Sequence, residues 1–272
     1  MKGIGNMKNN KLFIIITGAI IGLVAVLLVK FGNPANMGFC IACFIRDTAG
    51  ALKLHSAPIV QYIRPEIIGL VLGAAVMAFS KKELIARSGS NPLVRFVLGF
   101  FVMVGALMFL GCPLRMMLRI GGGDLNAIVG LVGFVGGILL GILALNKGFS
   151  LNRSYKVSNA ESYVFPVIQI IFLVLLVGVP SVLVFSQEGP GSMHAPVIIA
   201  LAAGLLVGAL AQRTRFCTVA GIRDSIMFKD FSMLYGFIVL IVVTIVVNLI
   251  FGFFNPGFEG QPVAHSDGLW NF

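Results

Sequence analysis

Charged residues are scarce in this chain of 272 residues, and their scarcity excludes an ordinary soluble protein. Asp, Glu, Lys and Arg make up 11% of the sequence and hydrophobic residues 58%, whereas a soluble domain carries about 25% charged residues. The mean hydropathy is +1.01. Apolar runs recur without the alternation of apolar and polar residues that a transmembrane β-barrel requires. We therefore predict an all-α polytopic membrane protein.

Several functional motifs are missing as well. The run Gly121-Gly122-Gly123 is not followed by Gly-Lys-Ser/Thr, so it does not form a phosphate-binding loop. No basic run alternates with aromatic residues, which argues against a nucleic-acid partner. Only four cysteines are present, and none lies in the long polar stretches at about 147–163 and 255–272. A fold stapled by disulfides is therefore excluded, and we expect no cofactor and no metal centre.

Seven apolar spans are predicted, and several are short for a bilayer, which needs roughly 20 residues per straight helix. They cover residues 12–30, 65–80, 96–110, 125–145, 164–186, 196–211 and 232–254. Two of them, 96–110 and 196–211, run directly into segments that contain cysteine. We expect short broken or re-entrant helices to complete the crossing at these places.

Loop charge predicts the orientation in the membrane. The N-terminal segment carries Lys2, Lys8 and Lys11, and the linker 146–163 is also basic, so both are expected in the cytoplasm. The connection 187–195 and the polar tail 255–272 contain no Lys or Arg and are expected on the other side. We predict a single transmembrane domain over residues 1–272, multi-pass, in the cytoplasmic (inner) membrane.

The chain repeats an unusual combination of residues. Phe39-Cys40 is separated by five residues from Arg46-Asp47, and Phe216-Cys217 is separated by five residues from Arg223-Asp224. The copies indicate a duplicated unit, with half-repeats at about 12–145 and 164–254. The first cysteine segment follows an outward-going span and the second follows an inward-going one. We therefore predict two pseudo-symmetric halves of inverted topology.

A third cysteine segment, Gly111-Cys112-Pro-Leu-Arg115, has no clear counterpart in the second half. In all three segments an arginine follows the cysteine by six or seven residues, which places thiol and guanidinium along one helix face. A charged side chain inside the membrane is costly and indicates function. We predict that three thiols converge near the bilayer centre along one path, those of Cys40, Cys112 and Cys217.

Further polar residues and glycines are expected to support this path. Neighbours in sequence do not face each other on a helix, so we expect each arginine of the repeat to pair with the aspartate of the other copy, Arg46 with Asp224 and Arg223 with Asp47. Glycines at 121–123 predict a sharp turn whose N–H groups line the site. The supporting set is Arg46, Asp47, Arg115, Arg119, Arg223, Asp224, Gly111, Gly121 and Gly122.

Three short motifs resemble those of a known family. They are Gly-Phe-Cys at 38–40, Gly-Cys-Pro-Leu-Arg at 111–115 and Arg-Phe-Cys-Thr at 215–218. Over about residues 12–250 the chain resembles the YeeE/YedE membrane family, and its selenium-associated YedE branch fits best. The resemblance implies an hourglass-shaped helical protein for uptake of thiosulfate and related sulfur compounds, with Cys40, Cys112 and Cys217 along its central path. Cys112 is followed by Pro-Leu-Arg rather than the Thr/Ser-Gly-His run of thiosulfate members, which brings a selenium substrate into consideration.

The chemistry of thiols suits such a path. A buried thiol stays neutral and offers a weak donor to a soft sulfur or selenium atom without trapping it. We therefore expect a transporter rather than an enzyme, driven passively or by a coupled ion because no ATP site is present. Its expected partners are a small sulfur or selenium anion, the lipid bilayer and a cytoplasmic sulfur- or selenium-carrier protein.

Two alternatives stay open from the residues alone. One is a membrane thiol-disulfide oxidoreductase that uses Cys40 and Cys43, although Cys43 is replaced by Ala220 in the second copy and is expected to be a packing residue. The other is passage of Cu(I), with methionines 37, 116 and 117 joining the cysteines as soft ligands. The arginines near every thiol argue against a cation.

Overall fold

The computed structural model describes residues 2–83, 86–89, 91–151, 154–158 and 160–272. Eleven α-helices occur in these residues: α1 (Lys2–Lys30), α2 (Ile41–Ala51), α3 (Pro65–Ser80), α4 (Pro92–Met108), α5 (Pro113–Gly121), α6 (Asn126–Asn146), α7 (Glu161–Gly178), α8 (Val197–Thr214), α9 (Thr218–Met227), α10 (Ser232–Phe251) and α11 (Gly268–Asn271). Two short strands, β1 (Arg87–Ser88) and β2 (Tyr155–Lys156), pair antiparallel.

Six helical stretches are long and apolar enough to cross a membrane, counted over the described residues. They are Asn10–Lys30, Pro92–Gly121, Asn126–Asn146, Glu161–Gly178, Val197–Met227 and Ser232–Phe251. The protein is therefore a mostly helical, multi-pass membrane protein. The span predicted at 65–80 is α3, a shorter apolar helix of 16 residues. In the part of the chain that the structure describes, seven full spans are thus not found, because α3 is too short to cross a bilayer as a straight helix.

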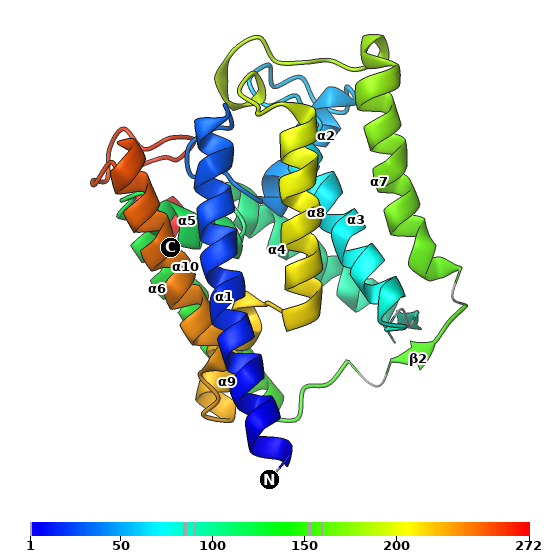
Figure 1. Cartoon of the computed structure of the whole chain (residues 1–272), viewed down its shortest axis with the longest axis vertical. Helices are drawn as coiled ribbons and strands as arrows, with labels where there is room; N and C mark the ends of the chain where they lie inside the picture. The colour runs from blue at the N-terminus through cyan, green and yellow to red at the C-terminus, as the bar shows by residue number, and fades with distance from the viewer. Residues whose placement is uncertain (1, 84–85, 90, 152–153, 159) are drawn as a thin grey trace.

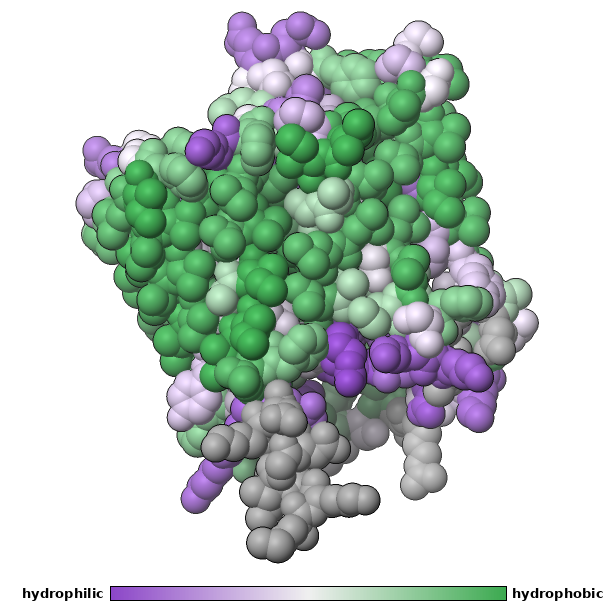
Figure 2. Space-filling model, in the orientation of Figure 1, coloured by the Kyte–Doolittle hydropathy of each residue, from purple (hydrophilic) through white to green (hydrophobic). Residues whose placement is uncertain are grey.

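The outer surface is suited to lipid. Figure 2 shows a broad hydrophobic face between polar residues at its two ends. Every residue of α4 is at least partly exposed although the helix is almost entirely apolar. In water such a surface would drive aggregation, whereas in a bilayer it is solvated by acyl chains.

Two helix pairs pack together most extensively. α1 packs beside α10, and α3 packs beside α8 (Figure 1). Followed from blue to red, α1 runs away from the N-terminal end, whereas α8 runs toward it (Figure 1). In the second pair the backbones touch through glycine, because a Cβ added at Gly204 would collide with the carbonyl of Glu66. Small residues permit this close approach between membrane helices.

We expect Gly204→Val to destabilise the protein and Gly137→Val to leave it unchanged. The first substitution forces α3 and α8 apart, which costs about 1–3 kcal/mol for an overpacked contact. The second adds the same atoms on α6, where nothing lies within 4 Å of an added Cβ. Thermal unfolding followed by circular dichroism in detergent measures the difference. Equal unfolding temperatures for both variants would contradict the packing of α3 on α8.

Three short helices begin directly after a cysteine. Cys40 precedes α2, Cys112 precedes α5 and Cys217 precedes α9, and each cysteine has extended backbone angles at the N-cap position. Pro113 starts α5 favourably because proline suits the first helical position, where no N–H partner is needed. The predicted broken helices at 96–110 and 196–211 are therefore present as α5 and α9.

The tail, residues 255–272, does not extend away as a polar appendage. It folds back along the glycine turn after α5, where Asn255 N donates to Gly122 O at 2.9 Å and Gly257 N donates to Gly123 O at 3.1 Å. Leu125 N in turn donates to Gly257 O at 3.1 Å. The tail is thereby attached to the centre of the protein.

Candidate thiol and arginine site

Three of the four cysteines lie together in one buried cluster. Cys40 and Cys43 are buried with Met37, and Cys112 packs against them together with Met103. Cys43 N donates to Cys40 Sγ at 3.3 Å, so the first thiol caps its own helix. The cluster joins the loop before α2, the side of α4 and the start of α5, and its members Met37 and Cys112 are 75 residues apart in the sequence.

Cys217 lies outside this cluster and is exposed at the start of α9. Two of the three predicted path cysteines, Cys40 and Cys112, are thus brought together, and Cys43 joins them in place of Cys217. The first copy has a long loop between α1 and Cys40, whereas Cys217 follows α8 after only Arg215 and Phe216. That loop carries the first cysteine inward, and the second copy lacks it.

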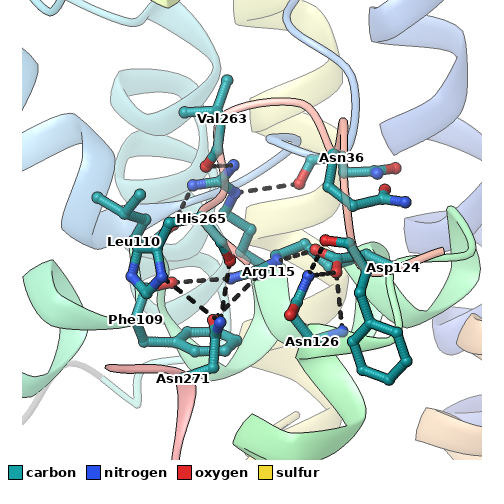
Figure 3. A network of polar contacts seen from close by, with 12 residues as sticks. Asn36, Phe109, Leu110, Arg115, Asp124, Asn126, Val263, His265 and Asn271 are labelled. Carbon is teal, nitrogen blue, oxygen red and sulfur yellow. Dashed lines mark hydrogen bonds and ion pairs between the residues drawn. The ribbon is translucent and has the colours of Figure 1, made fainter. Parts of the chain in front are cut away.

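A fully buried guanidinium, that of Arg115, lies against the thiols. Its Nη1 donates to Cys43 Sγ at 3.5 Å and to Leu110 O, while its Nε donates to Asn36 O at 3.2 Å. Its Nη2 donates to Val263 O of the tail at 3.0 Å. Figure 3 shows the three carbonyls turned toward this side chain. Gly111 leaves room for it, since a Cβ there would lie 3.0 Å from Arg115 Cδ.

Arg115 has no carboxylate partner among the ion pairs of the described residues. Its acceptors among these residues are all neutral. Burying a charge without a counter-charge is strongly unfavourable, and inside a membrane it marks a functional position. The site therefore carries an excess positive charge next to three thiols.

Arg119, one turn further along α5, is by contrast neutralised. Its Nε lies 2.6 Å from Asp124 Oδ2, and its guanidinium lies 4.3 Å from the centre of the Phe109 ring. Asp124 also accepts from the backbone N and Nδ2 of Asn126, each at 3.0 Å. This complete pairing indicates that Arg119 holds α5 to the start of α6.

The glycine turn after α5 has a different role from the predicted one. The N–H of Gly122 bonds to Leu118 O and that of Gly123 bonds to Ile120 O, so they do not line a site. Instead the glycine carbonyls bind neighbouring elements. Gly121 O accepts from Asn248 Nδ2 at 3.0 Å, and Gly122 O accepts from the tail. At the C-terminus of a helix the last N–H groups bond to carbonyls of the preceding turn, whereas the last carbonyls have no partner within the helix.

A second buried network surrounds Asp47. Its Oδ2 lies 2.8 Å from Arg64 Nε, and its Oδ1 lies 2.7 Å from Arg46 Nη2. Arg64 Nη2 also donates to Pro190 O, and Glu66 accepts from Asn33 Nδ2 at 3.0 Å. Two guanidinium groups and two carboxylates lie in this network, so its charges balance, whereas Arg115 has no carboxylate beside it among the described residues. This network ties α2 and α3 to the connection before α8.

The predicted pairing between the two copies is wrong. Arg46 pairs with its own neighbour Asp47, and Arg223 pairs with its own neighbour Asp224 at 2.8 Å. The long arginine side chain folds back along the helix to reach the adjacent carboxylate, which the rule for neighbouring positions did not allow for. Sequence reasoning also missed Arg64 and Glu66, although two charges beside a proline at the start of an apolar helix were a visible signal.

No protein-family model matches this chain, and no curated protein matches it.

Proposed function

We propose that this protein moves a small anion containing sulfur or selenium across the membrane through the cluster of Cys40, Cys43 and Cys112. The observation that carries the proposal is the fully buried Arg115, which contacts Cys43 and has only neutral acceptors. An anion would supply the missing counter-charge. Thiols at its side suit a soft sulfur or selenium atom.

The helix ends add to the attraction for an anion. α2 and α5 both begin at a cysteine of the cluster, so the positive ends of their dipoles point toward it. Discontinuous helices whose N-termini meet near a substrate are typical of transporters. Each single contact is weak, and weak successive contacts are what conduction requires.

We also propose that the chain forms an inverted repeat with a defined orientation in the membrane. α1–α2–α3 and α8–α9–α10 each comprise a long helix, a cysteine, a short helix and an apolar helix. The opposite directions of α1 and α8 support an inverted repeat (Figure 1). In this arrangement Cys217 marks the end of the path near the N-terminus, which we assign to the cytoplasmic face of the inner membrane. A cytoplasmic carrier protein would collect the cargo there.

The substrate class rests on chemistry and on the resemblance to the YedE branch together. The resemblance favours thiosulfate-like or selenium compounds, and the buried guanidinium beside thiols favours an anion with one charged and one soft end. The linker 146–163, on which the orientation partly depends, lies partly outside the described residues.

A thiol-disulfide oxidoreductase is the second candidate, favoured by the contact between Cys43 N and Cys40 Sγ. It predicts that Cys43→Ser abolishes activity while Cys112→Ser is tolerated, whereas transport through the cluster predicts that Cys112→Ser reduces uptake. Passage of Cu(I) has less support. Met116 and Met117 belong to the main hydrophobic core, and the described residues contain no group of three or more His, Cys, Asp or Glu placed to hold a metal ion.

We expect Cys40→Ala and Cys112→Ala to reduce uptake of labelled thiosulfate, selenosulfate or selenite about tenfold or more, which corresponds to 1.4 kcal/mol at the site. Cys217→Ala should reduce it less, because that thiol is exposed and makes no contact in the cluster. Uptake into whole cells is measured at matched protein abundance, with a strain lacking the protein as the control. Equal uptake by the wild type and all three variants would refute a path lined by thiols.

A further inference from the structure

The tail reaches the charged centre of the site through two separate contacts. Val263 O accepts from Arg115 Nη2 at 3.0 Å, and Asn271 Oδ1 accepts from Arg119 Nη2 at 3.4 Å. Between them, His265 Nε2 lies 2.7 Å from Met108 O at the end of α4. The tail therefore covers Arg115 Nη2, beside the Nη1 that donates to Cys43 Sγ, and Figure 3 shows Val263 next to Arg115.

The carbonyl that the tail presents to Arg115 comes from a strained residue. Val263 has a φ of 52°, in the left-handed region that a β-branched side chain rarely adopts. Leu110, which also gives its carbonyl to Arg115, has a φ of 57°. Strained backbone is retained where surrounding contacts enforce it, and it clusters at clamps and switches.

The start of the tail is fixed to the glycine turn, but its end is packed loosely. α11 borders a cavity of about 420 Å³ whose walls also include residues of α4, α5 and α6. Its large side chains are poorly packed, since Leu269 is 84% and Trp270 is 51% exposed. Few apolar contacts would therefore be lost if the tail moved away from Arg115.

We propose that the end of the tail, residues 262–272, forms a displaceable stopper, in which the Val263 carbonyl occupies the position at Arg115 that the transported anion takes. This inference rests on the proposed function. A guanidinium binds an anion more strongly than a neutral carbonyl, because the hydrogen bond then joins two charges. The arriving anion therefore replaces Val263 O, and release of the left-handed backbone at Val263 favours the exchange. Without an anion the tail returns and closes the path.

Two substitutions at position 263 change the stopper in opposite directions. Glycine adopts a φ near 52° without strain, so Val263→Gly holds the tail more firmly. Proline is fixed near −65°, so Val263→Pro prevents the tail from presenting its carbonyl to Arg115. Ser266→Pro is the matched control, because Ser266 is exposed in the same tail.

The first readout is the rate at which a water-soluble maleimide modifies the buried thiols, measured in the full chain carrying Cys217→Ala so that the exposed cysteine does not contribute. We expect Val263→Pro to speed modification about tenfold and Val263→Gly to slow it a few-fold, as expected when the rate follows the open population. Ser266→Pro should match the parent. Equal rates for all four proteins would overturn the stopper.

The second readout is the fluorescence of Trp270, the single tryptophan of the chain, which lies in the tail. Thiosulfate or selenosulfate should shift its emission in the wild type and leave it unchanged in Val263→Pro. No shift in the wild type would contradict displacement of the tail by anions.

The expected order of maleimide rates without uptake of any tested anion would support the stopper and refute the proposed function. Normal uptake together with equal maleimide rates would support the proposed function and refute the stopper.

Discussion

Replacing Arg115 by glutamine is expected to reduce anion uptake by roughly 10- to 100-fold, since a hydrogen bond to a charged group contributes about 1.5–3 kcal/mol. Glutamine is neutral, so it cannot balance the charge of an anion at the thiols. Arg115→Lys keeps the charge but not the fork of donors that reaches Asn36, Leu110 and Val263. We therefore expect the lysine variant to retain part of the uptake.

The control for this experiment is Arg215→Gln, which removes an arginine whose side chain is 67% exposed and pairs with Glu83 on the surface. It should transport like the wild type. Abundance in the membrane and elution as a single species in detergent separate a loss of transport from a loss of folding. Normal uptake by well-folded Arg115→Gln would remove the central argument for an anion path.

Asp47→Asn should destabilise the protein by about 3–5 kcal/mol, the usual cost of removing one partner of a buried ion pair. Asp47 is fully buried between Arg46 and Arg64, and Arg64 is itself 1% exposed. Without the Asp47 carboxylate, the two guanidinium groups of this network keep a single carboxylate. That carboxylate is Glu66, which lies 3.8 Å from Arg64 Nη1.

The repeat supplies a matched control for this prediction. Asp224→Asn removes the equivalent carboxylate of the second copy, but its pair with Arg223 is partly exposed at 43% and 28%. Exposed pairs contribute about 0–1 kcal/mol, so little change is expected. Unfolding midpoints in detergent, compared for the two variants, test the difference. A large loss for Asp224→Asn, or none for Asp47→Asn, would contradict the burial of the first network.

The two copies of the repeat show where reasoning from sequence stops being sufficient. Their cysteine, arginine and aspartate have identical spacing, and in both copies the arginine pairs with its neighbour. Yet Cys40 and Asp47 are buried whereas Cys217 is exposed. Local spacing determines contacts within a helical turn or two, while burial depends on which other helices cover that turn.

Hydropathy and composition were enough to predict a helical, multi-pass membrane protein, because a bilayer accepts only segments whose backbone polar groups are bonded internally. The cysteine segments and the broken helices after 96–110 and 196–211 were also visible in the sequence. The tertiary structure alone decided that Cys43 joins Cys40 and Cys112, that Arg115 lacks a carboxylate among the described residues, and that the tail returns to it. The contacts of Cys112 with Cys40, and of Arg115 with Cys43 and Val263, join positions more than 70 residues apart, and no local propensity or spacing rule specifies them.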